Sequence, residues 1–152
     1  YLCLNGSPCI ISFNMHESDV SFFMKKDYIM TGSDGHVPTS KTAKIHPRSY
    51  GAFTRKIRKY VREDEIISME HAIRAATSLP ASMLGLKDRG LLKEGYAADI
   101  VIFDPAKIRD EASFEDPQKH SSGLPYLIVN GVIVIDNNKY NGKLAGKPIR
   151  MN

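Results

Sequence analysis

The sequence changes character between residues 86 and 95, and this change limits the folds that the chain can adopt. Before it, strand-like and helix-like segments alternate, which is typical of parallel βαβ units with right-handed crossovers. After it, the segments are mainly strand-like. The sequence therefore predicts an α/β protein in two parts, residues 1–86 and residues 87–152.

The first part contains short apolar runs of strand length and stretches with apolar residues at helical spacing. We predict strands at residues 9–13 and 28–32, helices at 17–26, 53–61 and 68–76, and a loop at 35–49. Ser68 is the expected N-cap of the last of these helices. Pro80 is expected to start a further helical turn, and Gly85 to end it in a left-handed conformation.

The second part contains the dipeptide Asn130-Gly131 between two apolar runs, a strong signal for a two-residue hairpin turn. We predict strands at residues 100–103, 126–129 and 132–135, a turn at 136–139, and a terminal strand at 148–151.

Composition excludes several classes of protein. The 152 residues suit about one domain, and 42% hydrophobic with 25% charged residues is typical of a soluble globular chain. The net charge of +4 is too small to indicate a nucleic-acid-binding domain. The basic face at residues 55–62 is followed directly by three acidic residues and has no interleaved aromatic platform, so we interpret it as a solvated helix face.

The chain shows no apolar run long enough to span a membrane and no secretory signal. Cys3 and Cys9 fit neither a disulfide framework nor a cysteine-based zinc site. We therefore expect a reducing, cytoplasmic setting. The chain opens with Tyr1 rather than Met, which indicates a missing leader or a piece of a longer protein.

Asp34 is the first candidate site residue, because it directly follows a predicted buried strand. In parallel α/β folds the carboxyl ends of strands line the site, so this carboxylate is placed to face a substrate or a metal. Ser33-Asp34-Gly35 is equally explained as a simple turn.

The loop after Asp34 carries His36 and His46, which with Asp34 could supply metal ligands, although their spacing matches no compact ligand motif. Arg48 follows them and offers a planar, always-charged fork that suits a carboxylate. From the sequence alone, solvated loop histidines and a surface arginine are the favoured interpretations.

Several ordered motifs together resemble the C-terminal region of the N-acyl-D-amino-acid deacylases, the D-aminoacylase branch of the amidohydrolase superfamily. The motifs are MTGSDG at 30–35, HPRSYGAF at 46–53, TSLPA at 77–81, LGLKDRG at 84–90, GYAADIVIFD at 95–104, FEDP at 114–117 and VNG at 129–131.

The resemblance implies a fragment of a metal-dependent (β/α)₈ barrel, with its last strands and helices, followed by β-sandwich strands. It implies zinc-assisted hydrolysis of the amide bond of a small N-acyl-D-amino acid. Residues 9–13 and 28–32 then match the last two barrel strands. Asp34 matches the aspartate that binds metal and shuttles the proton, and Arg48 matches the arginine that grips the substrate's α-carboxylate.

The sequence also departs from that family, because it has no His-x-His pair and no counterparts of the other metal ligands. A catalytic zinc normally keeps about three protein ligands, so Asp34 alone does not hold one with useful affinity. We therefore expect zinc in a longer parent enzyme and an inactive isolated chain. Two barrel strands cannot close a barrel, so their unpaired edges favour self-association through strand pairing.

Two alternatives stay open. One is a cyclic amidohydrolase of the dihydroorotase or hydantoinase kind, against which the HPR and FEDP segments argue. The other is a non-enzymatic structural or interaction module, in which Asp34 has no catalytic role.

Overall fold

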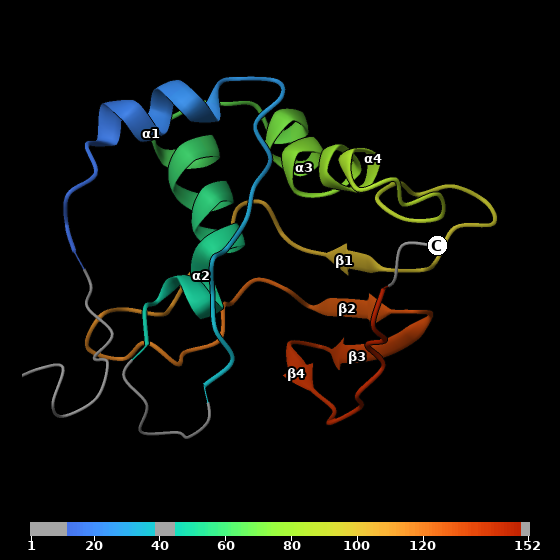
Figure 1. Cartoon of the computed structure of the whole chain (residues 1–152). Coiled ribbons are helices and arrows are strands. Elements are labelled where there is room, and N and C mark those ends of the chain that lie inside the picture. The colour runs from blue at the N-terminus through green and yellow to red at the C-terminus, as the bar shows by residue number, and fades with distance from the viewer. Residues whose placement is uncertain (1–11, 39–44, 150–152) are drawn as a thin grey trace, which may run out of the picture.

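The computed structural model describes residues 12–38 and 45–149, which form a group of helices beside a small antiparallel sheet (Figure 1). The first part of the chain contributes the helices and the last part contributes the strands. The mainly strand-forming last part agrees with the prediction, whereas the alternation of strands and helices predicted for the first part is not present in its described residues. The elements in chain order are α1 (Glu17–Met24), α2 (Arg48–Arg55), η2 (Lys56–Glu63), α3 (Met69–Ala76), α4 (Ser78–Met83), β1 (Ile100–Ile102), β2 (Tyr126–Val129), β3 (Val132–Asp136) and β4 (Lys139–Tyr140).

The central helix is longer than the predicted helix 53–61. It begins at Arg48 as α2 and continues without a break as η2, a stretch of π-helix. Pro47 lies at its start with φ −53°, and proline is favoured there because it has no N–H to leave unpaired and a helical φ. The predicted loop 35–49 is therefore shorter at its C-terminal end.

Two other predicted helix signals are confirmed. The Ser68 side chain caps α3 by accepting a hydrogen bond from the His71 backbone N–H. Gly85 has φ +67°, the left-handed conformation expected of a residue that follows a helix. Helix α4 begins at Ser78, two residues before Pro80.

The sheet is a meander of order β1-β2-β3-β4 with antiparallel neighbours throughout. Asn130 and Gly131 have φ values of 47° and 79°, so the predicted two-residue hairpin turn is confirmed. The predicted turn at 136–139 joins β3 to β4 through Asn137 and Asn138, which also have positive φ. Residues 148 and 149 form no strand, and the rest of the predicted terminal strand lies outside the described residues.

The predicted strand at residues 28–32 is wrong, because this segment has no strand conformation and pairs with no strand in the described part of the chain. A strand is defined by its partner, and the apolar run alone supplies none. The Thr31 N–H instead donates to the Ala75 carbonyl oxygen of α3 at 2.8 Å. Of the predicted strand 9–13, residues 12 and 13 are not in a strand and the others lie outside the described residues.

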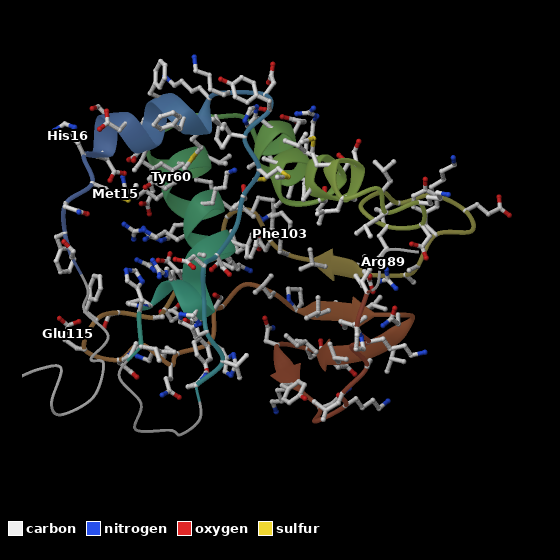
Figure 2. All side chains as sticks on the ribbon, in the orientation of Figure 1. Met15, His16, Tyr60, Arg89, Phe103 and Glu115 are labelled. Carbon is white, nitrogen blue, oxygen red and sulfur yellow. The ribbon has the colours of Figure 1, made fainter. Side chains whose placement is uncertain are left out.

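The core of the helical part lies where η2, α1 and α3 meet. Tyr60, Ile67 and Ala72 are buried there, and Val20 and Met24 of α1 pack against them. Figure 2 shows Tyr60 directly beneath α1. This packing fixes the orientation of the α2–η2 helix, whose other end carries Arg48.

The segment between β1 and β2 packs back on the α2–η2 helix. Thr54 and Ser121 share a hydrogen bond of 2.7 Å, and the Ser121 hydroxyl donates to the Tyr50 carbonyl. Ile108 is 1% exposed and is the most deeply buried large side chain of the described residues. Residues on either side of the predicted boundary at 86 and 87 thus contact one another, and the division into two domains stays a prediction.

None of the helices in the described ranges is long and apolar enough to cross a membrane.

Candidate functional site

Asp34 and Arg48 are in direct contact, although they are 14 positions apart in the sequence. The Arg48 Nη2 atom lies 2.7 Å from Asp34 Oδ2, and the Arg48 Nε–H donates to the Asp34 carbonyl oxygen at 2.9 Å. One guanidinium therefore holds both the side chain and the backbone of Asp34. The two residues expected to act on one substrate lie at one place in the structure.

The backbone of Asp34 has φ 47°, a left-handed conformation that aspartate tolerates better than most residues. This turn directs the chain against the first turn of α2. A Cβ atom on Gly35 would lie 2.8 Å from the Ser49 Cα atom, so the close approach requires glycine at this position. The Ser49 hydroxyl then accepts a hydrogen bond from the His36 N–H at 3.1 Å.

His46 lies at the same site, directly before the α2 helix. Its Nδ1 atom accepts a hydrogen bond from the Arg48 N–H at 3.0 Å, at the start of α2. Burial and the nearby Arg48 charge lower the pKa of His46, and Asp34 partly opposes this effect. The neutral ring is thus the form that fits this position.

A cavity of about 600 Å³ lies beside this site, between α2–η2 and residues 109–115. Arg48 lines it together with His46, Phe114 and the exposed Arg109. Asp34 does not line it, and its side chain is 79% exposed. The structure therefore places Arg48 between the carboxylate of Asp34 and a cavity of ligand size.

A buried ion pair in the same cavity wall was not predicted from sequence. The Asp110 side chain is 7% exposed and accepts a hydrogen bond from Arg58 Nε at 2.5 Å. The Arg55 Nη1 atom lies 3.6 Å from Asp110 Oδ2. Asp110 and Glu63 together raise the pKa of Arg58. The basic face at 55–62 is thus only partly solvated, because the Arg58 side chain is 18% exposed. No local signal links Arg58 to an acid 52 residues away.

The residues that the structure describes do not form a metal site by themselves. Within residues 12–38 and 45–149, no group of three or more His, Cys, Asp or Glu side chains lies close enough to hold an ion. The Asp34 carboxylate is moreover paired with a cation. This donor set does not fit a catalytic zinc, which needs about three ligands, so we derive no chemical step through a metal.

The chain belongs to the amidohydrolase family, whose model matches residues 24–135. It is 41% identical to an N-acyl-D-glutamate deacylase of Alcaligenes xylosoxydans xylosoxydans over 88% of this chain and 26% of that protein. A crystal structure of a D-aminoacylase superposes with a TM-score of 0.80 at 37% identity, covering 87% of this chain and 27% of the other. The predicted resemblance to the deacylase branch is confirmed.

Two further comparisons bear on the metal and on the alternative function. A Bordetella bronchiseptica N-acyl-D-glutamate deacylase, solved with zinc and a phosphonate inhibitor, matches with a TM-score of 0.74 at 39% identity, over 79% of this chain and 25% of that one. A Lactobacillus acidophilus dihydroorotase is 32% identical over 64% of this chain and 24% of its own length. The chain spans about a quarter of the length of the relatives that it matches.

The opposed effects of Arg48 and Asp34 on His46 give a prediction. In an NMR titration of the chain, the His46 ring should titrate below 6.5, because the folded environment disfavours its charged form. Arg48→Ala should raise this pKa, whereas Asp34→Asn should lower it further. Since the folded pKa is lowered, the His46 contribution to stability is present above pH 6.5 and is lost as the pH falls through the folded pKa. Shifts of the same sign in both variants would contradict the geometry of the site.

Proposed function

We propose that this chain is the C-terminal part of a zinc-dependent amidohydrolase that cleaves the amide bond of N-acyl-D-amino acids. The observation that carries the proposal is the contact between Arg48 and Asp34 beside a ligand-sized cavity, in a chain of the amidohydrolase family. The deacylase relatives support it, because they match nearly the whole chain at about 40% identity.

Arg48 is proposed to bind the α-carboxylate of the substrate. In the structure its guanidinium already holds a carboxylate, that of Asp34. Both side chains are exposed, at 40% and 79%, and such a pair contributes only about 0–1 kcal/mol to stability. A substrate carboxylate can therefore replace Asp34 on the guanidinium at little cost, while the bond from Nε to the backbone keeps Arg48 in place.

Asp34 is proposed to move the proton. Once released from Arg48, its carboxylate can take a proton from the attacking water and pass it to the leaving nitrogen of the amide. The left-handed turn and the contact of Gly35 with Ser49 hold the carboxylate at a fixed place beside Arg48. Asp34 can also serve as one metal ligand, but the remaining ligands must come from residues outside those described here.

The roles proposed for Arg48 and Asp34 are not sufficient for catalysis by the isolated 152-residue chain. Arg48 and Asp34 supply positioning and proton transfer, but a carboxylate base by itself is too weak to generate hydroxide at neutral pH for attack on an unstrained amide. We therefore propose that these residues act together with the metal ligands of the complete enzyme.

The proposed role of Asp34 predicts a large loss of activity. In the complete enzyme, Asp34→Asn should lower kcat/KM for N-acetyl-D-amino acids by about 10²–10⁴-fold, because the amide cannot accept the proton. The control is Asp136→Asn, at an exposed carboxylate at the end of β3, which should leave kcat/KM unchanged. Retention of turnover by Asp34→Asn would remove Asp34 from the reaction.

Hydrolysis of dihydroorotate, but not of N-acetyl-D-amino acids, by the unaltered enzyme would favour the cyclic-amide alternative.

The proposed role of Arg48 predicts discrimination between two substrates. Arg48→Ala should weaken hydrolysis of a free-acid substrate by about 10–100-fold, the value of a charge-assisted hydrogen bond of 1.5–3 kcal/mol. Hydrolysis of the matching α-carboxamide should fall less, because that substrate has no carboxylate to bind and loses only the hold of Arg48 on Asp34. Arg62→Ala, at an exposed arginine of the same helix, is the matched control. Equal losses on the acid and the amide would show that Arg48 does not bind the carboxylate.

A further inference from the structure

Lys56 stands apart from the other basic residues of the α2–η2 helix, because it is buried. It is 7% exposed, and its ammonium group donates a hydrogen bond to the Thr31 hydroxyl at 2.5 Å. Arg55, Arg58 and Lys59 each pair with at least one carboxylate. In the described part of the chain, no carboxylate pairs with Lys56.

Burial of an ammonium group opposite a neutral hydroxyl is costly. The group loses its hydration. It has three hydrogens to donate and donates one of them to the Thr31 hydroxyl oxygen. Burial accordingly lowers the pKa of Lys56. An apolar side chain of similar length would fill the same space without that cost. The stability of the fold therefore does not explain why position 56 is a lysine. The hydrogen bond from Lys56 to Thr31 points to another role.

Thr31 begins the segment that ends at the site. Its N–H is held by the Ala75 carbonyl of α3, and its hydroxyl is held by Lys56. Gly32 follows it, and a Cβ atom there would meet nothing within 4 Å, so the segment gains no packing at that point. Its next attachments are those of Asp34 to Arg48 and of His36 to Ser49.

The α2–η2 helix therefore holds this segment at two points. Arg48 and Ser49 hold its far end, and Lys56, about two turns further along the same helix, holds its beginning. A contact at both ends fixes the path of the loosely packed residues between them. The distance from Lys56 to Arg48 along one rigid helix thereby sets where Asp34 can lie.

We propose that Lys56 is a positioning residue, which acts through Thr31 to hold the Asp34 turn in register with Arg48. Its effect on catalysis depends on the function proposed above, whereas its effect on the segment does not. Lys56 touches neither the Asp34 carboxylate nor the neighbouring cavity.

The test is amide hydrogen exchange of the 152-residue chain, with Lys56→Met, Thr31→Val, the double variant, and Lys59→Met as a matched control. Lys59 lies on the same helix but pairs with Glu17 and Asp64 instead of Thr31. The readouts are the Gly35 and His36 amides, which donate to the Ser33 and Ser49 hydroxyls. The Gly131 amide, bonded to Ala98 in the second part of the chain, reports global unfolding.

Each single variant at Thr31 or Lys56 should speed exchange at Gly35 and His36 by about tenfold relative to Gly131. The double variant should be no faster than Lys56→Met, because the hydroxyl has no partner once the ammonium is gone. Lys59→Met should not change the ratio. If Thr31→Val does not fold because it leaves a buried charge unpaired, Lys56→Met alone decides the outcome.

In the complete enzyme, Lys56→Met should lower kcat by about tenfold and change KM by less than about twofold, because Arg48 remains free to bind substrate. Exchange that rises equally at Gly35, His36 and Gly131, or that adds in the double variant, would reduce Lys56 to a general stabilising role and overturn the proposal. An inactive unaltered enzyme would instead refute the proposed function and leave the exchange result valid.

Discussion

The site depends on one close approach, in which the left-handed turn at Asp34 lies against the first turn of α2. Glycine at position 35 permits it, because any Cβ atom there would collide with the Ser49 backbone. The approach brings the Asp34 carbonyl and carboxylate within reach of one guanidinium. The same α2–η2 helix lines the cavity beside Arg48 and carries the buried Lys56, and its Arg48 contributes to the lowered pKa of His46.

The local signals in the sequence were sufficient wherever a few neighbouring residues determine the structure. The Ser68 cap, the left-handed Gly85 and the Asn130-Gly131 turn depend on short-range sterics and hydrogen bonds, and all three are present. The strand at 28–32 failed because its conformation depends on partners that an apolar run does not specify, and the described residues provide none. The helix start at Arg48 was missed because the apolar periodicity begins only at Phe53.

For the site, the family resemblance selected Asp34 and Arg48, and the structure brings them together. It did not predict that they would bind each other, since each was expected to face a ligand. Arg58 was misjudged for a different reason, and the burial of Lys56 was not predicted. Their partners, Thr31 and Asp110, are far away in sequence, and helical spacing does not show which charged residues become buried. Charge burial is a property of the tertiary structure.

Family membership and the described geometry lead to one account. The chain belongs to the amidohydrolase family, and its described residues include no metal-ligand cluster. We propose that Asp34 and Arg48 supply proton transfer and carboxylate binding, and that the chain therefore contributes part of a catalytic site. Equilibrium dialysis of the 152-residue chain against Zn²⁺, combined with an N-acetyl-D-glutamate hydrolysis assay, tests this most directly. The account predicts that the 152-residue chain shows no turnover. It also predicts that Asp34→Ala leaves the amount of bound zinc unchanged. One equivalent of zinc that is lost with Asp34, together with measurable hydrolysis, would contradict it.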